Sequence, residues 1–489
     1  MQGIGIISWM LIISLIGAIL SYGFGKRNDL AGKSIAIGFT ILLFILSLYL
    51  WISANPVGDD FIFTENITWI PSLGINYSVG IDGISLPLVL ATTLLTMLAT
   101  MGSWSMISTK IAQYYGLLLL LEMGLLGVFV SLNLIVFFLF WEIVLVPMFL
   151  LIGIWGGPNR KYAAMKFIIF TNAGSALMFV GFILLFLAAT PHTFDFFILM
   201  DTEISKPFQL IIMITTFFGF AVKLPVVPLH TWLLDAHVEA PAPISVLLAG
   251  VLLKMGGYGF IRINLSLFPE ISFAYAPFFI GLALLTIFYG AGVALIQRDL
   301  KMMIALTSIN HMGFVLLGTF TGNLLGLSGA VFQMFNHACA VGLLFLLSGV
   351  IQHNAGTRDI NKLSDMLHRM PKTTALFVFG ALASMGFPFL SSFVSEFMVF
   401  MGAINALSFT VIVVLAPGIV TAYFVWTIDR IVLRPKNQVQ IGQYESHEAK
   451  MSELIPVAIF VIPIILLGLF PSLMLQTIVP SCQKLLENI

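Results

Sequence analysis

The feature that most constrains this chain is a succession of long apolar segments that recur along its whole length. In a lipid bilayer each segment must pair its own backbone polar groups, so an apolar run of about 20 residues is predicted to be a membrane-spanning helix. Charged residues make up only 9% of the 489 residues, too few for the polar shell of a soluble protein this large. We therefore predict an all-α membrane protein with about fourteen spans. The predicted spans are residues 3–23, 32–53, 84–107, 112–131, 133–155, 162–189, 207–227, 241–263, 272–296, 302–321, 325–351, 373–404, 406–430 and 454–479.

Charge and cysteine content exclude several classes of function. Lysine plus arginine and aspartate plus glutamate number 22 each, so no basic field for nucleic acid exists. The two cysteines, Cys339 and Cys482, cannot build a disulfide scaffold, a thiolate zinc site or an iron–sulfur cluster. The sequence contains no HExxH zinc motif.

The distribution of basic residues predicts the orientation. Of the 22, 17 lie in alternate loops that begin with the loop at 26–33, and two lie inside spans. The remaining three, Lys206, Arg262 and Lys484, lie on the other side. This bias predicts a cytoplasmic 26–33 loop and places both termini outside.

The longest outer loop, 54–83, holds four acidic residues and no basic residue: Asp59, Asp60, Glu65 and Asp82. It also holds Asn-x-Ser/Thr triplets at Asn66 and Asn76. Such triplets are common by chance, so the sequence does not establish glycosylation.

Ionisable residues inside predicted spans are the informative positions, because each costs about 2.5–3.5 kcal/mol at a helix centre on insertion scales and such groups tend to line ion paths. A set of structural polar contacts between helices is the alternative interpretation. Seven such residues in one chain favour the ion path. They are Glu122, Glu142, Lys223, Lys254, His311, His337 and Glu396.

Spacing predicts that several of these residues share one depth. Glu122 and Glu142 flank a short outer turn at similar distances, as do His311 and His337, which places all four near mid-membrane. Two prolines follow Lys223, and a proline and a glycine precede Glu396, so both spans are predicted to be interrupted. Transporters use interrupted helices at ion sites.

The order of these residues suggests an internal duplication. Glu142 and His311 are 169 positions apart, and Lys223 and Glu396 are 173 apart. Each pair occupies equivalent helices if spans four to eight and nine to thirteen are two five-helix units. Units with an odd number of helices, repeated in tandem, must be inverted across the membrane.

Several motifs together resemble a known family. The long block from Leu229 to Arg262 reads LHTWLLDAHVEAPAPISVLLAGVLLKMGGYGFIR, and FWEIVLVPMFLLIGIWGG surrounds Glu142. FAVKLPVVP, SINHMG and FVSEF carry three further ionisable residues. The chain resembles, over about residues 75–430, the proton-pumping antiporter-like subunits of respiratory complex I, and specifically the chain-4 or M-type member. The resemblance implies fourteen transmembrane helices and two inverted five-helix bundles, with helices seven and twelve discontinuous.

The resemblance also implies roles for these residues. Glu142 and Lys223 form the charge pair of an input half-channel, and Lys254 is the central relay. His311 and His337 continue the hydrated axis to Glu396, the terminal proton station. Glu122 matches a secondary carboxylate, and glutamate rather than lysine at 396 distinguishes this subunit from its sister pumps.

The implied organisation has four parts. Residues 1–111 form three N-terminal spans, 112–263 the first half-channel unit, 264–430 the second, and 431–489 an inner connection and a last helix. The chain itself is expected to bind no cofactor, because flavin and iron–sulfur clusters belong to partner subunits. The partners are other membrane and peripheral subunits, including sister antiporter-like subunits. The expected location is the plasma membrane of a prokaryote. The sequence names neither the electron donor nor the acceptor, and it leaves proton against sodium open.

Two other functions remain open from the sequence. A multisubunit sodium/proton antiporter subunit shares Glu142, Lys223 and Lys254, although Glu396 argues against it. A membrane enzyme that binds haem or metal would use His311 and His337 as ligands. His230 and His237, in the connection before residue 241, either form interfacial hydrogen bonds or admit protons.

Overall fold

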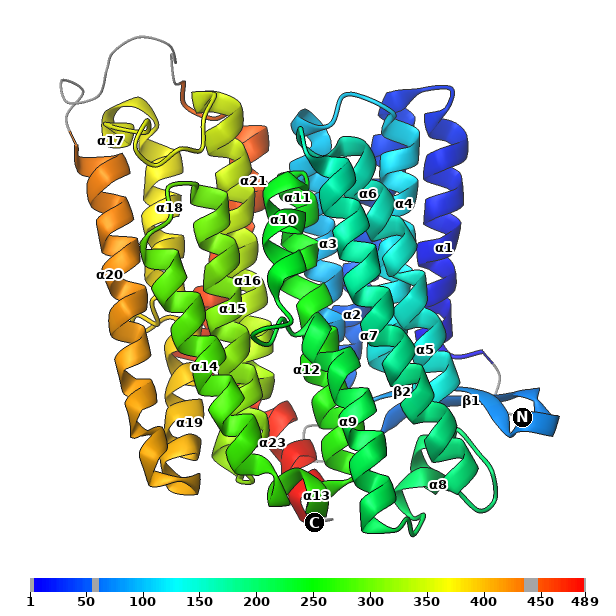
Figure 1. Cartoon of the computed structure of the whole chain (residues 1–489). Helices are drawn as coiled ribbons and strands as arrows, with labels where there is room; N and C mark the ends of the chain where they lie inside the picture. Colours follow the sequence, from blue (N-terminus) through cyan, green and yellow to red (C-terminus); the bar gives the residue numbers. More distant parts are fainter. Residues whose placement is uncertain (1–3, 55–60, 435–446, 488–489) are drawn as a thin grey trace.

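The computed structural model describes residues 4–54, 61–434 and 447–487. Nearly all of them form one upright bundle of helices, shown in Figure 1. Thirteen helices among these residues are long and apolar enough to cross a membrane. The all-α membrane architecture predicted from the apolar runs is therefore confirmed.

The remaining predicted span, 373–404, is not one continuous helix. It is split into α18 (Pro371–Ser384) and α19 (Ser391–Ala406), and each piece is shorter than the roughly 20 residues that a crossing needs. Pro388 lies in the interruption, where it cannot supply a helical N–H.

The first half of the bundle contains three helices made of several pieces. Its elements are α1 (Ile6–Gly25), α2 (Asp29–Ser53), α3 (Leu86–Met106), α4 (Ile111–Val130), α5 (Leu134–Ile143) followed by α6 (Leu145–Trp155), α7 (Arg160–Ala188), the short α8 (Phe196–Met200), α9 (Lys206–Lys223) followed by α10 (Thr231–Glu239), and one crossing made of α11 (Ala242–Leu247), η2 (Leu248–Leu252), α12 (Leu253–Gly259) and η3 (Phe260–Leu265).

The second half begins with the short α13 (Pro269–Ala274). Its further elements are α14 (Ala276–Leu295), α15 (Leu300–Thr319), α16 (Leu324–Ala355), the short α17 (Met366–Arg369), α18, α19, η4 (Ser408–Leu415) with α20 (Ala416–Ile428) and η5 (Asp429–Leu433), α21 (Met451–Ile459) with α22 (Val461–Leu469), and α23 (Ser472–Glu487).

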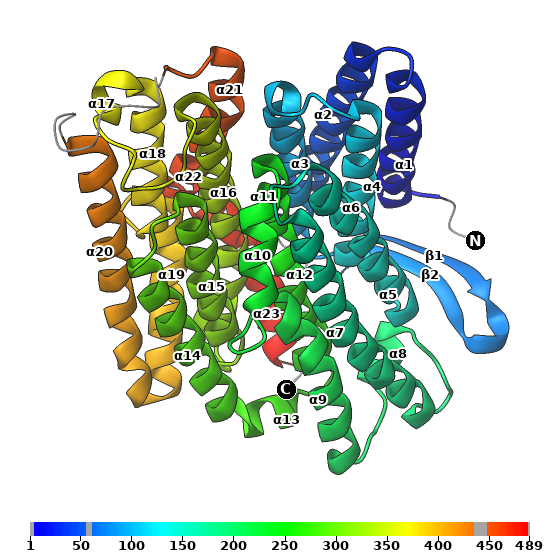
Figure 2. The same ribbon diagram turned by 45° about the horizontal axis from the view of Figure 1, so that its top comes forward.

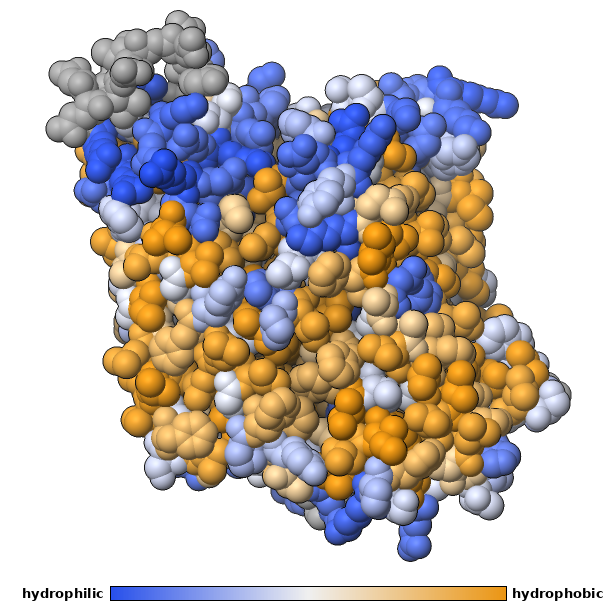
Figure 3. Space-filling model, viewed as in Figure 1, coloured by the Kyte–Doolittle hydropathy of each residue, from blue (hydrophilic) through white to orange (hydrophobic). Residues whose placement is uncertain are grey.

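Burial separates central from peripheral helices. In α16, 94% of the residues of its 18-residue apolar stretch are buried, whereas in α2 only 28% are buried. The exposed side chains of the peripheral helices are large and apolar, and they form the continuous orange belt in Figure 3. Such a belt suits contact with lipid tails, because no other solvent tolerates that much apolar surface.

The basic loops gather at one end of the bundle. The connections after α1, α6, α14 and α16 lie together at the top of Figure 1, and that end is the hydrophilic cap in Figure 3. The start of α1 and the whole of α23 lie toward the opposite end.

The segment predicted as an outer loop, 54–83, contains regular secondary structure. It contains an antiparallel hairpin of β1 (Ile62–Ile70) and β2 (Ile75–Ile81), joined by the turn η1 (Pro71–Leu73), which projects from the bundle in Figure 2. Glu65 on β1 accepts hydrogen bonds from the backbone N–H groups of Ile7 and Ser8, so the hairpin caps the first turn of α1. Asp59 and Asp60 lie outside the described residues.

Candidate functional site

A chain of ionisable side chains runs through the buried centre of the bundle. The ammonium of Lys254 on α12 donates to Nδ1 of His337 on α16 at 2.6 Å and to the carbonyl oxygen of Ala249 at 2.6 Å. The ring centroid of His337 lies 5.3 Å from that of His311 on α15. Nδ1 of His311 lies 3.1 Å from a carboxylate oxygen of Glu396 on α19. Four residues that the sequence singled out separately thus form one continuous row.

Gln333 on α16 ties the far end of this row together. Its amide nitrogen lies 3.3 Å from the Glu396 carboxylate and 3.2 Å from Nδ1 of His311. Its amide oxygen accepts a hydrogen bond from Ser395, which in turn accepts one from Asn336. The carboxylate therefore lies within a polar network that joins the three helices α15, α16 and α19.

The two histidines have different hydrogen-bond partners. Nδ1 of His311 lies 3.1 Å from the Glu396 carboxylate, which accepts, and 3.2 Å from the Gln333 amide nitrogen, which donates, while Nε2 lies 3.3 Å from the Ser384 hydroxyl. His337 accepts at Nδ1 from the Lys254 ammonium, so its own N–H is on Nε2.

Lys223 and Glu142 lie near each other without forming a direct ion pair. Their charges interact, but no ion pair within 4.0 Å joins them among the described residues. The Lys223 ammonium instead lies 4.8 Å from the ring centroid of Trp141, a cation–π contact. This ammonium and one carboxylate oxygen of Glu142 are buried without a hydrogen-bond partner among the described residues. The two members of the predicted charge pair are therefore not in direct contact in this structure.

The first interrupted helix places Lys223 at a helix end. Lys223 is the last residue of α9, where the partial negative charge of the helix terminus favours a cation. The indole N–H of Trp232 on α10 donates to the carbonyl oxygen of Val222, which satisfies part of the backbone that the break frees.

Gly256 brings the Lys254 helix against this break. A Cβ at this position would lie 2.6 Å from the backbone nitrogen of Leu224 and 2.6 Å from the carbonyl oxygen of Phe220. Only glycine allows such a close backbone approach. π-helical η2 and η3 flank the α12 segment that carries Lys254, and widened turns of this kind are frequent at functional sites.

The second interrupted helix shapes the surroundings of Glu396. Between α18 and α19 the chain passes through Gly386 at φ 69°, a left-handed conformation suited to glycine. A Cβ at this position would lie 2.8 Å from the Glu396 carboxylate. Asn336 donates to the carbonyl oxygen of Ser391, the first residue of α19.

Three other candidate residues form no hydrogen bond or ion pair with this row among the described residues. Both carboxylate oxygens of Glu122 are buried and have no hydrogen-bond partner among the described residues. The ring of His237 stacks on Phe345 at 4.6 Å, and neither ring nitrogen has a partner in the same part of the chain. The interfacial hydrogen bonds expected of His237 are therefore not found. His230 packs edge-on against Tyr289.

The sequence search missed the uncharged members of the network. Gln333 lies four positions before His337, on the same face of α16, so helical spacing from a buried histidine would have found it. Ser384 and Ser395 gave no signal, because single serines are common in membrane helices. Within the described residues, no group of three or more His, Cys, Asp or Glu side chains is placed to hold a metal ion.

Comparisons with known proteins agree with this architecture. Residues 131–423 match the family described as NADH:quinone oxidoreductase/Mrp antiporter, transmembrane. The chain is 40% identical over 461 residues to the NAD(P)H-quinone oxidoreductase chain 4 1 of Picosynechococcus sp., which covers 92% of this chain and 86% of the relative. It is 35% identical to the NADH-quinone oxidoreductase subunit M of Rickettsia prowazekii, over 99% of this chain and 98% of the relative.

Solved structures share the fold. A chain of respiratory complex I from Thermus thermophilus superposes with a TM-score of 0.87 at 27% identity, covering 97% of this chain and 99% of that one. A chain of the Mrp complex from Dietzia sp. also gives a TM-score of 0.87, over 98% of this chain and 97% of that one, at 18% identity. The chain therefore belongs to the NADH:quinone oxidoreductase/Mrp antiporter transmembrane family.

Proposed function

We propose that this chain is a proton-translocating membrane subunit of a redox-driven pump of the complex I type. The observation that carries the proposal is the buried row from Lys254 through His337 and His311 to Glu396. Ionisable groups are costly inside a membrane bundle and tend to mark proton relays. The names of two relatives, quinone oxidoreductase chain 4 and subunit M, support the proposal that the pump is driven by a redox reaction.

The row suits stepwise proton transfer. Lysine, histidine and glutamate each gain or lose a proton when their electrostatic surroundings change. The Lys254 ammonium already donates to His337, so the first acceptor is in contact. The two imidazole rings are close enough for a single intervening water molecule to connect them, and His311 then contacts the Glu396 carboxylate.

Glu142 and Lys223 supply the input end of this proposed pathway. When the carboxylate is near, it stabilises the Lys223 ammonium, and when it moves away the proton is released toward Lys254. In the arrangement seen here Lys223 lies over Trp141 rather than against Glu142, as the proposal requires when the carboxylate is away and the proton has not yet left. Glu122 remains a proposed secondary carboxylate on α4.

The proposal also includes the other subunits of the complex. The energy comes from quinone or related acceptor reduction in other subunits, where flavin and iron–sulfur clusters reside. Sister antiporter-like subunits lie beside this chain in the plasma membrane of a prokaryote, with both termini outside. The four-part division at residues 111, 263 and 430, with two inverted five-helix units, stays part of this proposal.

The second candidate function is a subunit of a multisubunit sodium/proton antiporter. The observation that favours it is the fold shared with the Mrp complex chain. At 18% identity that likeness concerns the fold alone. Genes for iron–sulfur and quinone-pocket subunits beside this gene would support the redox pump, and genes for antiporter subunits would support the second candidate.

Glu396→Gln tests the proposed function. The substitution keeps the size and the hydrogen bonding of the side chain but removes its ability to take up a proton. We expect normal assembly and a proton yield per electron pair lowered by at least about tenfold, since positioned acid–base groups contribute roughly 10²–10⁴. Proton uptake and electron transfer are measured together in vesicles that contain the whole complex.

Two further variants control this experiment. Glu396→Asp keeps a carboxylate and is expected to be mild, and Glu396→Lys is expected to retain part of the activity, because lysine also binds and releases a proton. If Glu396→Gln pumps at the parental ratio, Glu396 is structural and the proposed exit pathway is wrong.

A further inference from the structure

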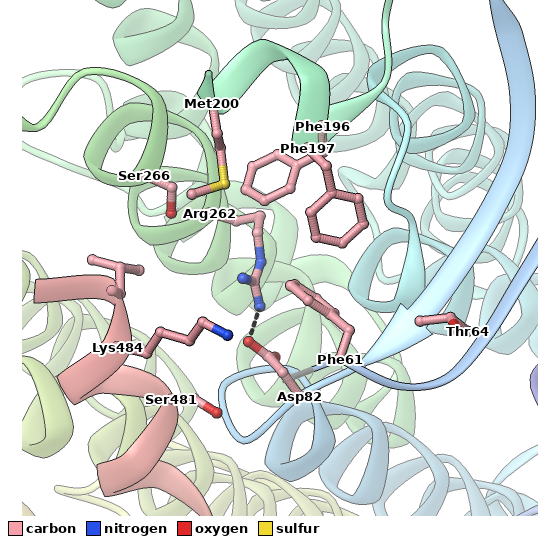
Figure 4. Close-up of a pocket in the computed structure, with 11 residues that line it drawn as sticks. Phe61, Thr64, Asp82, Phe196, Phe197, Met200, Arg262, Ser266, Ser481 and Lys484 are labelled. Carbon is pink, nitrogen blue, oxygen red and sulfur yellow. Dashed lines mark hydrogen bonds and ion pairs between the residues drawn. The ribbon is translucent and has the colours of Figure 1, made fainter. Parts of the chain in front are cut away.

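Two of the buried carboxylates in this chain are held in different ways. Asp82, directly after β2, accepts a hydrogen bond of 2.6 Å from the Arg262 guanidinium, and both side chains line the pocket in Figure 4, at the end of the bundle away from the basic loops. An arginine does not give up its proton in a protein, so Asp82 has a permanent counter-ion. Glu396 is only 4% exposed and forms no ion pair with a lysine or arginine among the described residues. Its charge therefore depends on neutral and titratable neighbours.

Three polar atoms form a closed triangle at Glu396. Its Oε1 lies 3.1 Å from Nδ1 of His311, and the Gln333 amide nitrogen lies 3.3 Å from that Oε1 and 3.2 Å from that Nδ1. The Gln333 side chain is fully buried on α16, between the other two residues on α15 and α19. The Ser395 hydroxyl donates to the amide oxygen of Gln333, which keeps the amide nitrogen toward the triangle.

Nδ1 of His311 cannot serve both neighbours with a single arrangement of hydrogens. A ring nitrogen of histidine either carries a hydrogen and donates, or has a lone pair and accepts. With a hydrogen on Nδ1, the ring and the Gln333 amide both donate to the Glu396 carboxylate. With that hydrogen on Oε1 instead, the bare Nδ1 accepts from the same amide. Gln333 therefore has an acceptor in both arrangements, because its amide nitrogen carries two hydrogens.

One proton transfer connects the two arrangements. When His311 is doubly protonated, the N–H bond at Nδ1 breaks, its electron pair stays on the nitrogen, and an O–H bond forms at Oε1 of Glu396. Imidazolium and carboxylate then become two neutral groups. The Ser384 hydroxyl, 3.3 Å from Nε2 of His311, accepts from that nitrogen in both states. A buried acceptor without a donor is costly, so a donor that serves the deprotonated group in each state makes both states accessible.

We propose that Gln333 is a positioning residue whose amide donates to whichever of His311 and Glu396 has given up the shared proton, and that it sets the pH range over which the row releases protons. This inference deepens the proposed pumping function and rests on it. Gln333 takes up no proton itself. It acts by stabilising the deprotonated form of each neighbour, so without the amide both neighbours hold their protons to higher pH.

Few other titratable groups face this triangle. From α16, the ring centroid of His337 lies 5.3 Å from that of His311, and His337 accepts from Lys254 on α12. From α20, Tyr423 interacts electrostatically with the Glu396 carboxylate. Among the other elements packed against α15 and α19, α22 and η4 carry no ionisable side chain. The remaining ionisable residues of the neighbouring helices form no hydrogen bond or ion pair with the triangle in the described part of the chain: Asp235, His237, Glu239, Tyr258, Tyr289, Cys339, His353 and Lys372.

Gln333→Met tests the proposal, because methionine keeps the length of the side chain and removes both donors. We expect the whole pH profile of the proton yield per electron pair to move about one unit toward higher pH, the weight of one hydrogen bond to a charged group. The yield is measured over a range of pH in vesicles that contain the whole complex. A merely structural role would lower the yield without moving the profile.

Infrared spectroscopy follows the protonation of Glu396 itself. The C=O band of its protonated carboxyl group is the difference between the spectra of the complex and of its Glu396→Gln variant, and the band is titrated with pH. In the Gln333→Met background the same band is expected to persist to a pH about one unit higher. This measurement does not depend on pumping, so the two failures are distinguishable. Parental pumping by Glu396→Gln refutes the proposed function, whereas an unmoved titration refutes the role of Gln333.

A second variant and a control accompany this test. Gln333→Glu keeps the size of the side chain and the hydrogen bond from Ser395, but it replaces the donor by a second carboxyl group. Two carboxylates this close do not readily ionise together, so we expect a larger shift in the same direction than with Gln333→Met. Asn264→Leu is the matched control, because it removes another buried amide, which accepts a hydrogen bond from Thr216 and lies outside the row. We expect it to lower stability and leave the pH profile unmoved.

Three results would overturn the proposal. An unmoved titration of Glu396 in Gln333→Met, whether or not pumping falls, would mean that the amide is only structural. A shift toward lower pH would mean that the amide stabilises the protonated forms instead. An equal shift in Asn264→Leu would mean that the loss of any buried amide changes the bundle as a whole.

Discussion

Lys223 is the residue where proton transfer can be separated from simple charge. Arginine keeps the positive charge and the cation–π contact with Trp141, but it does not release its proton at any pH that proteins tolerate. We therefore predict that Lys223→Arg assembles normally and pumps roughly a hundredfold more slowly. Lys206→Arg, at an exposed ion pair, is the control and should pump normally. Full pumping by Lys223→Arg in vesicles would remove this lysine from the relay.

At the same scale, the sequence reveals which ionisable residues are buried but not which of them are in contact. Buried charge is visible in a sequence, because an ionisable residue inside an apolar run is rare. The contact between Lys254 and His337 joins residues 83 positions apart, and it depends on how two helices rotate about their axes. No periodicity determines that rotation. Gln333 carries no charge, so buried charge alone does not identify it.

At the scale of the elements, the contact between α12 and the interrupted end of α9 can be tested by a substitution at Gly256. In an ordinary helix, replacing glycine by alanine is favourable by about 1 kcal/mol. At Gly256 the new Cβ would meet backbone atoms of Leu224 and Phe220 at 2.6 Å, so we predict a net loss of about 1–3 kcal/mol and reduced pumping. Gly281→Ala on α14, where nothing lies within 4 Å, is the matched control. Thermal unfolding of the assembled complex and its proton yield are the measurements. Equal behaviour of the two variants would mean that the α12 contact is not tight.

The elements themselves were predictable to different degrees. Both interruptions were expected, since the prolines near Lys223 and Glu396 cannot continue a helix. The 14-residue and 16-residue pieces α18 and α19 follow from that break. The hairpin of β1 and β2 was not expected. Its strands are stabilised by contacts with α1 through Glu65, and these contacts have no local signal in the sequence.

For the whole molecule, the clustering of the basic loops at one end supports a test of orientation. We predict that a reporter fused after Ile489 is accessible from outside, and that one inserted beside Gly356, between α16 and α17, is cytoplasmic. The sequence also predicts a cytoplasmic site near Asn437, which lies outside the described residues. Impermeant labelling of intact cells distinguishes the two sides. The reverse pattern would invert the orientation and the direction of proton movement.

The pair formed by Asp82 and Arg262 also has a consequence for how the protein is made. The two residues are 180 positions apart, and the shared ion pair is almost fully buried. A ribosome adds about 5–20 residues each second, so Asp82 leaves the ribosome roughly 10–40 s before its counter-ion. A carboxylate buried without a partner is strongly destabilising, so the segment after β2 cannot settle into its final place until the crossing that ends in η3 has been inserted. The end of the first half of the bundle that carries the β1–β2 hairpin is therefore completed late in synthesis, after most of the helices of that half are already in the membrane.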